Sequence, residues 1–246
     1  MNVAFFASCL IDQFRPDVGL AAVDVLERCG CTVIFDERQT CCGQPAFNSG
    51  HHAEARDVCQ RAIHLLHEQV VQQGCEAIVC PSGSCAAMLH HAAGLLQGDD
   101  ADMAASVASH VHELGSFLVD VLDRTDVEAD WSGRVTWHDA CHGLRDLGIR
   151  DQPRLLLNKV RGLELVEATT CDRCCGFGGT FSVSMPGISL AMADEKLDEL
   201  EGLGVDAVVS GDVSCLMQLE GRLRDRGSSI RGLHLAEILA SRGAGS

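Results

Sequence analysis

The chain has 246 residues, 14 of them cysteine, with 46% hydrophobic residues and a formal net charge of −16. This acidity excludes nucleic-acid binding and direct docking on an anionic membrane, since both need a basic surface. A chain of this length folds without disulfides, so this many thiols indicate metal or redox chemistry in a reducing compartment.

Short apolar strands alternate with amphipathic helices in the predicted N-terminal half. We expect strands at Val3–Cys9, Thr32–Phe35 and Ala77–Cys80, and helices at Pro16–Cys29, His52–Gln73 and Ala86–Leu96. Such alternation is typical of parallel βαβ units in an α/β fold. Residues 99–133 follow as a predicted helical connection, in which Val111–Leu122 has helical spacing.

The C-terminal half begins the same pattern again after Gly133. We expect strands at Arg134–Cys141, Leu163–Ala168 and Ala207–Ser210, helices at Gln152–Val160 and Ile188–Leu203, and a short strand with a closing helix in Ile230–Ala240. The predicted fold class is therefore α/β, with two pseudo-repeated βαβ-type halves and mainly parallel sheets. Residues 1–98 and 134–246 are the two predicted repeats.

Four cysteines recur in register in the two halves. They are Cys9, Cys41, Cys42 and Cys85 in the first half, and Cys141, Cys174, Cys175 and Cys215 in the second. Matching cysteines lie 130 to 133 positions apart, and segments 76–85 and 206–215 align without a gap. An internal duplication that keeps four cysteines in register is hard to attribute to packing.

Each half places these cysteines after consecutive strands, at the carboxyl edge where open parallel sheets bind ligands. An adjacent Cys-Cys pair reaches different corners of a polynuclear cluster, and Gly43 or Gly176 directly after the pair lets the backbone approach the sulfurs. Four thiolates suit Zn²⁺ or an iron–sulfur cluster. The long spacing within each set favours iron–sulfur over structural zinc, and a thiol–disulfide function is the third alternative.

His138 and His142 flank Cys141 and are the candidate catalytic residues outside the cysteines. Either could ligate iron, move a proton or bind a substrate carboxylate; the alternative is a hydrogen bond to cluster sulfur or a cap of the following segment. The other six cysteines are interpreted as packing residues: Cys29, Cys31, Cys59, Cys75, Cys80 and Cys171. The sequence has no dinucleotide, nucleotide or zincin motif, so a hydride acceptor would have to come from elsewhere.

The combined motifs resemble the cysteine-rich (CCG) domain family. The matching segments are Thr40–Gly50, Pro81–Cys85, His138–His142 and Cys174–Phe181, which are spread over most of the chain. That family includes the cysteine-rich subunit of heterodisulfide reductase and the iron–sulfur subunit of glycolate oxidase. Within it the chain most resembles the lactate-utilization group, the iron–sulfur subunits of L-lactate dehydrogenase systems.

The resemblance implies an iron–sulfur electron-transfer subunit of a multi-protein complex that oxidises L-lactate to pyruvate. It implies two partner subunits, one of them containing iron–sulfur clusters, and it makes the eight repeated cysteines ligands of up to two [4Fe–4S] clusters. Lactate itself is a candidate ligand. The sequence shows no basic leader and no apolar span, so we expect a cytoplasmic protein without direct membrane insertion, either free or held at the membrane through partners.

One departure from the heterodisulfide reductase pattern concerns its last element, which there is Cys-x-x-Cys. The first position of that pair is Ser82 in one half of this chain and Asp212 in the other. Four thiolates per half fit a cubane cluster, whereas the non-cubane cluster of that enzyme has five. The open alternatives are a zinc-stabilised, non-enzymatic interaction module and a thiol/disulfide oxidoreductase similar to heterodisulfide reductase.

Overall fold

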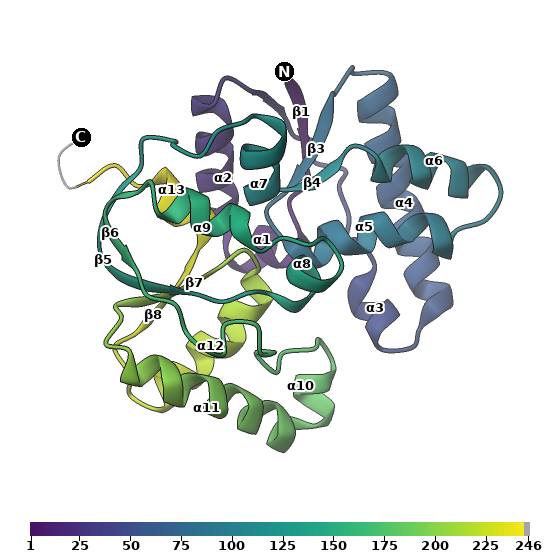
Figure 1. Cartoon of the computed structure of the whole chain (residues 1–246). Helices are drawn as coiled ribbons and strands as arrows, with labels where there is room; N and C mark the ends of the chain where they lie inside the picture. Colours follow the sequence, from purple (N-terminus) through teal and green to yellow (C-terminus); the bar gives the residue numbers. More distant parts are fainter. Residues whose placement is uncertain (244–246) are drawn as a thin grey trace.

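Two four-stranded parallel sheets form the frame of the computed structural model, which describes residues 1–243 (Figure 1). The strand order is β2-β1-β3-β4 in the first sheet and β6-β5-β7-β8 in the second, so the topology repeats. The strands are β1 (Asn2–Phe5), β2 (Thr32–Ile34), β3 (Ala77–Cys80), β4 (Val111–Glu113), β5 (Asp130–Trp137), β6 (Arg161–Leu165), β7 (Ala207–Ser210) and β8 (Arg231–His234). The predicted α/β class with two similar, parallel halves is confirmed.

Helices connect the strands, as parallel pairing requires. They are α1 (Cys9–Phe14), α2 (Pro16–Arg28), α3 (Gln44–Asn48), α4 (His52–Val71), α5 (Gly83–Leu95), α6 (Asp99–Ala108), α7 (Leu114–Ser116), α8 (Cys141–Arg145), α9 (Asp151–Leu157), α10 (Phe181–Ser184), α11 (Pro186–Gly202), α12 (Val213–Asp225) and α13 (Leu235–Ala240). A π-helical turn, η1 (Phe117–Val121), follows α7. Across residues 1–243, no helix combines the length and the apolar character that crossing a bilayer would take.

Both faces of each sheet are covered, and successive side chains of a strand point to opposite sides. In β1, Val3 and Phe5 face the helices between the two sheets, while Ala4 faces α4, α5 and α6 on the outside. The second sheet has α9 and α13 on its inner side and α11 and α12 on its outer side (Figure 1). Strands buried on both faces explain the continuous apolar runs in the sequence.

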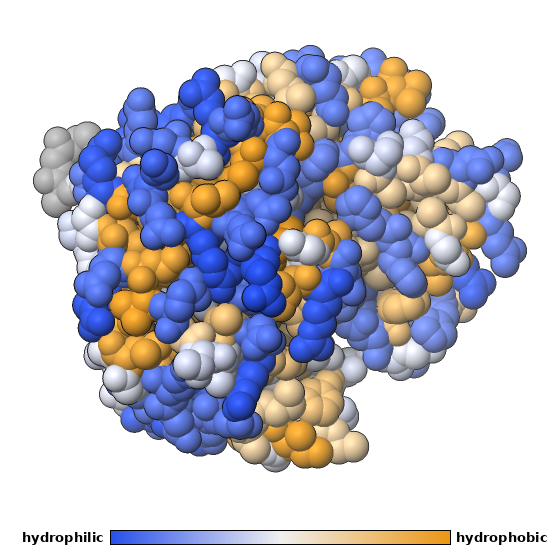
Figure 2. Space-filling view, viewed as in Figure 1, coloured by the Kyte–Doolittle hydropathy of each residue, from blue (hydrophilic) through white to orange (hydrophobic). Residues whose placement is uncertain are grey.

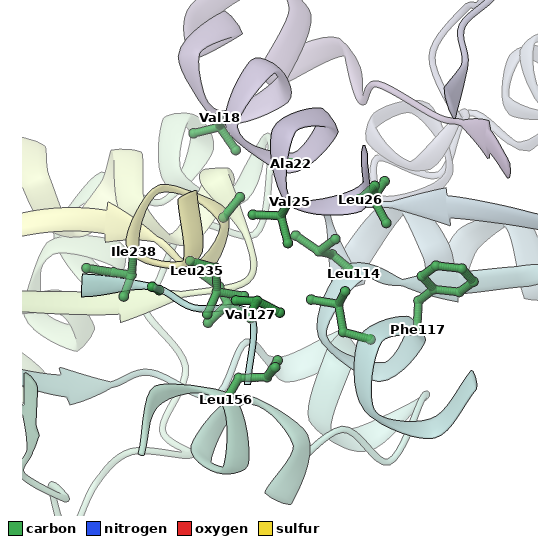
Figure 3. Close-up of a cluster of buried hydrophobic side chains, with 14 of the residues drawn as sticks. Val18, Ala22, Val25, Leu26, Leu114, Phe117, Val127, Leu156, Leu235 and Ile238 are labelled. Atoms are coloured by element: carbon green, nitrogen blue, oxygen red, sulfur yellow. The ribbon is translucent and has the colours of Figure 1, made fainter. Parts of the chain in front are cut away.

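One hydrophobic core joins the two halves (Figure 3). It brings together side chains of α2, α7, α9 and α13, among them Val25, Leu114, Leu156 and Ile238, all at most 1% exposed. Burying an aliphatic side chain of this size contributes roughly 1.5–3 kcal/mol. The two halves are therefore stabilised by a shared core as well as by their own outer clusters.

Polar contacts also tie the halves together. Arg15, between α1 and α2, forms ion pairs with Glu237 at 2.8 Å and with Glu220 at 3.4 Å. Arg28 at the end of α2 donates to the backbone carbonyl of Leu239 at 2.6 Å. Because these contacts are partly shielded from solvent, they hold the two sheets in a defined relative position. The space between the halves thus has fixed walls.

The structure corrects three of the predicted elements. Cys9 and Cys141 each begin a short helix instead of ending a strand, because both strands leave the sheet several residues before the apolar run ends. The helix predicted over Val111–Leu122 is wrong at its start, where Val111–Glu113 forms β4 and pairs with β3 in the register Ile78↔Val111. The apolar spacing of this segment fits either a helix or a strand. It forms a strand because the edge of β3 has free backbone groups with which it can pair.

Candidate metal centres

The eight repeated cysteines lie at the carboxyl edges of the two sheets. In the first half, Cys9 begins α1 directly after β1, the pair Cys41-Cys42 follows β2, and Cys85 lies in the first turn of α5 after β3. The second half repeats this placement after β5, β6 and β7. All 14 cysteines of the chain lie in the described residues and are free thiols. The duplication predicted from the sequence therefore gathers four thiols in each half.

The thiols of the first set are in direct contact. The Sγ atoms of Cys9 and Cys41 are 3.6 Å apart, and those of Cys42 and Cys85 are 3.3 Å apart. Hydrogen bonds from Cys42 and Cys9 lower the pKa of Cys41 to about 3, whereas the pKa of Cys9 is raised by its bond to Cys41 and by burial. Neighbouring thiols this close resist ionising together. A cation among them would allow all four to act as thiolate ligands.

The second set shows the same pattern of ionisation. Cys174 is hydrogen-bonded to Cys141 and to Cys175, and Cys175 is in turn hydrogen-bonded to Cys215. The bonds from Cys141 and Cys175 lower the pKa of Cys174 to about 2, while the pKa of Cys141 is raised by its bond to Cys174 and by burial. Each half therefore offers a chain of four hydrogen-bonded thiols, and a bound cation would allow them to ionise together.

A left-handed glycine follows each cysteine pair. Gly43 (φ +91°) and Gly176 (φ +87°) each donate a backbone N–H to the sulfur two residues earlier, that of Cys41 or Cys174, at 3.4 Å. A Cβ atom on Gly176 would lie 2.5 Å from the carbonyl oxygen of Ser189. The sharp turn therefore needs glycine for its conformation and for space. The role of these glycines toward a cofactor stays a prediction.

Ser82 and Asp212 cap helices at the two positions where the heterodisulfide reductase pattern has cysteine. The Ser82 hydroxyl accepts a hydrogen bond from the backbone N–H of Cys85 at 3.4 Å. The Asp212 carboxylate accepts from Ser214 N–H of its own helix at 3.1 Å and from Ser84 N–H of α5 at 2.9 Å. A carboxylate at a helix N-terminus is favourable, and this one serves two helices. It thereby joins the turns that carry Cys85 and Cys215.

Both cysteine sets line one cavity of about 380 Å³ between the halves. The repeated cysteines on its wall are Cys9, Cys42, Cys85, Cys141, Cys174, Cys175 and Cys215. Leu10, Pro45, Phe177 and Val183 contribute apolar surface. A small molecule in this space could touch ligands of both sets, and an apolar wall strengthens charge interactions inside it.

The two candidate histidines take different positions. His142 lines the cavity, is partly exposed, and its Nδ1 lies 2.6 Å from Asp146 Oδ2. His138 is buried, at 1% exposure, and is not among the described residues on the cavity wall. Burial and the nearby charge of Lys196 lower the pKa of His138 to about 3, so its imidazole is neutral. Only His142 is placed to meet a molecule in the cavity.

The nitrogen atoms of His138 lie beside two cysteines of the second set. One ring nitrogen of His138 and the Sγ atoms of Cys175 and Cys215 all lie within 4.8 Å of one another. Within residues 1–243, no other three histidine, cysteine or acidic ligand atoms come this close together. Imidazole and thiolate are ligands of the same metal ions. The composition of this group is that of a metal-binding site.

Sequence reasoning missed Cys80 and Lys196. Cys80, the last residue of β3, contacts Cys85 and adds a fifth thiol to the first set; burial raises its pKa. Strand alternation could have indicated it, because it shares the outer face of β3 with Ile78. Because the matching residue in the second half is Ser210, the repeat gave no reason to expect Cys80 near the other thiols.

Lys196 of α11 is a buried lysine beneath the second cysteine loop. Its Nζ donates to the backbone carbonyls of Thr170 at 2.6 Å, Cys171 at 3.3 Å and Arg173 at 3.3 Å. Burial lowers the pKa of Lys196. The signal in the sequence is a charge on the apolar face of the predicted helix, one position before Leu197. The side chain fixes the loop that leads into the Cys174-Cys175 pair.

Comparison with known proteins identifies similar chains over the whole length. A profile of the cysteine-rich domain family (CCG) matches residues 3–90 and 135–220. "Lactate utilization protein A" of Geobacillus sp. (strain WCH70) is 45% identical over 244 residues, covering 98% of this chain and 100% of that protein. The protein of the same name from Bacillus cytotoxicus is 44% identical with the same coverage.

Among solved structures, an aspartate racemase homologue from Pyrococcus horikoshii is similar at a TM-score of 0.33 and 13% identity. The alignment covers 97% of this chain and 95% of that one. A similarity of this size carries no argument about function.

Proposed function

This chain belongs to the cysteine-rich (CCG) domain family, and we propose that it is an iron–sulfur electron-transfer subunit of a system that oxidises L-lactate to pyruvate. The observation that carries the proposal is the pair of four-thiol sets, of whose eight cysteines all but Cys41 line one cavity. The names of the full-length relatives support lactate as the substrate of the system. The spacing and register of the thiols support iron–sulfur clusters over a single structural ion.

The residues proposed as ligands are the repeated cysteines. They are Cys9, Cys41, Cys42 and Cys85 for one centre, and Cys141, Cys174, Cys175 and Cys215 for the other. The sulfur contacts of 3.3–3.6 Å in the first set support this assignment, because thiols this close together can bind one polynuclear ligand. Bound [4Fe–4S] clusters, up to two per chain, would supply reversible one-electron transfer. Cys80 gives the first centre a fifth sulfur within reach.

Oxidation of L-lactate to pyruvate releases two electrons and two protons. Because the chain shows no nucleotide-binding motif, we place the hydride or electron abstraction on a partner subunit and electron uptake on this one. The carboxylate of Asp146 orients His142 at the cavity wall, so that this histidine can hold or release a proton there. His142 is therefore the proposed proton-handling residue.

Partner subunits need a docking surface near the cavity. Apolar side chains cluster where α10 meets α11 (Figure 2), with Val183 at 81% and Ile188 at 57% exposure. Val183 also lines the cavity. Exposed apolar groups gathered in this way mark interaction sites. We place the electron-donating partner, one of the two expected subunits, against this edge.

Anaerobic purification followed by iron and acid-labile sulfide analysis tests the proposal. We expect several iron atoms with matching sulfide per chain, and L-lactate should reduce the clusters only when the partner subunits are added. A variant with both Cys41→Ser and Cys174→Ser is the matched control and should hold little iron. A colourless protein containing zinc would instead support the interaction module, and activity that survives complete metal removal would support thiol/disulfide chemistry.

A further inference from the structure

The imidazole of His138 has no hydrogen-bond partner although it is buried. Both ring nitrogens are inaccessible to solvent, and within residues 1–243 neither makes a hydrogen bond of normal geometry; the backbone carbonyl of Cys171 is near the ring but not aligned with it. Buried polar atoms are nearly always paired, so an unpaired imidazole next to thiols points to a ligand that completes it.

The backbone around His138 is held on both sides. The His138 N–H donates to Val209 O at 2.8 Å, and the Asp139 N–H donates to Cys171 O at 3.0 Å. The Asp139 carboxylate is fixed in turn by Arg154 at 3.0 Å. The ring is therefore anchored on a rigid segment at the end of β5. Preorganised support of this kind is what a metal ligand needs.

The neighbours of the ring are sulfurs. One ring nitrogen and the Sγ atoms of Cys175 and Cys215 lie within 4.8 Å of one another, which is close enough for one metal ion to contact all three. Among the described residues, His138 does not line the cavity, so a molecule bound in the cavity would not touch it. These positions favour a ligand to metal over a group that acts on substrate.

The first half has no counterpart to this nitrogen. Phe6 takes the matching place, since its N–H donates to Val79 O at 2.9 Å as His138 N–H does to Val209 O. A phenyl ring cannot ligate a metal. The first set has the additional thiol of Cys80 instead, where the second has the hydroxyl of Ser210.

We propose that His138 supplies an imidazole nitrogen ligand to the metal held by Cys175 and Cys215, which makes the second centre a mixed thiolate–imidazole site. The first centre is bound by thiolates alone. This assignment rests on the proposed function only in requiring a metal at the second set. The two centres then differ in ligand charge and hence in redox potential, because the second has a neutral imidazole where the first has the additional thiol of Cys80, and a neutral ligand in place of a thiolate raises the potential.

Pulsed EPR on protein labelled with [¹⁵N]histidine tests the assignment without changing the chain. The reduced, anaerobically prepared protein should show a strongly coupled ¹⁴N signal that becomes ¹⁵N on labelling. His138→Phe, which installs the first-half residue, should abolish the signal, whereas His142→Phe should keep it. A thermal melt of each variant checks that it is folded.

The outcomes separate this inference from the proposed function. A protein that holds no iron would overturn both. A protein with iron and sulfide but without a strongly coupled histidine nitrogen would overturn only the role of His138. A weak coupling, of the size that a hydrogen bond to sulfur gives, would also overturn ligation, as would a strong signal that persists in His138→Phe.

Discussion

The two halves hold their cysteines alike but differ in the side chains behind them. Where the first half has Phe6, the second has His138, and both backbones are fixed by the same contact to the next strand. The backbone carbonyls of Ala55 in α4 and Ser189 in α11 pack against the matching glycines Gly43 and Gly176, so Ala62 and Lys196, seven positions further along each helix, also take matching places. The repeat therefore keeps the thiols and changes their surroundings.

The fold fixes the positions of the thiols in each half, and the neighbouring side chains differ. The first set lies among apolar side chains with one additional thiol, Cys80. The second set lies beside an imidazole and above the ammonium group of Lys196. Polar and charged neighbours alter the potential and the affinity of a metal centre. We expect two centres with the same arrangement of four cysteines but different electron affinities.

The largest expected effect comes from removing one thiol in either half. Cys85→Ser and Cys215→Ser should each lose about half of the iron, because each change disables one four-thiolate site and leaves the other intact. Iron analysis on the two purified variants measures this, with Cys29→Ser, in a packing position, as the control. An unchanged iron content in both variants would contradict the ligand assignment.

A second contrast concerns the residue that caps the helix after the fourth strand of each sheet. Glu113 caps α7 through Gly115 N–H at 2.7 Å, and burial raises its pKa to about 7. His234 caps α13 through Ala236 N–H at 3.1 Å, and burial lowers its pKa to about 4. The two caps should respond to pH in opposite directions.

The raised pKa of Glu113 gives stability that is complete below the ordinary value of 4.5 and is lost as pH rises to about 7. Glu113→Gln does not lose this stability. The difference in free energy of unfolding, variant minus native, should therefore rise by about 3 kcal/mol as the pH goes from 4.5 to about 7. Urea denaturation at several pH values measures the gain. A difference that stays constant with pH would show that Glu113 is not buried as described.

The control for this experiment is His234→Asn. The lowered pKa of His234 means that stability is present above its ordinary value of 6.5 and is lost as pH falls toward 4. The free energy of unfolding of His234→Asn, relative to that of the native protein, should therefore rise as the pH falls, whereas for Glu113→Gln it rises as the pH increases.

A smaller effect is expected from the lysine that only the second half contains. Lys196→Met removes the donor for three backbone carbonyls and should cost about 2 kcal/mol. Ile63→Met, a change of similar volume on the buried face of α4, alters no polar contact and should cost less than about 1.5 kcal/mol. Denaturation curves compare the two, and iron retained on dilution should fall only in the lysine variant. Equal losses of unfolding free energy in the two variants would show that the hydrogen bonds of Lys196 do not stabilise the second half.

The sequence was sufficient for the elements whose burial is complete. The strands Ala77–Cys80 and Ala207–Ser210 were predicted to the residue, because each begins with a short apolar run and is followed by turn residues. The register of the repeated cysteines predicted two thiol groups at the sheet edges, as the structure has them. Element ends were harder: the one-turn helices that begin at Cys9 and Cys141 depend on how the chain leaves each sheet.

The residues behind the thiols could not be predicted from periodicity. Cys80 and Lys196 both lie on apolar faces, and the pattern along one element does not say which buried neighbour a side chain will meet. The same holds for Asp212, whose second carboxylate oxygen caps α5 from the other half. Contacts between the repeats arise only when both sheets are in place.

EPR spectroscopy of the fully reduced protein tests whether two metal centres face one cavity. Asp212 joins the turns that carry Cys85 and Cys215, so the two spins should be close enough to interact. We predict a broadened or split spectrum for the native protein and narrow, single-centre spectra for Cys85→Ser and Cys215→Ser. A native spectrum equal to the simple sum of the two variant spectra would contradict the shared cavity.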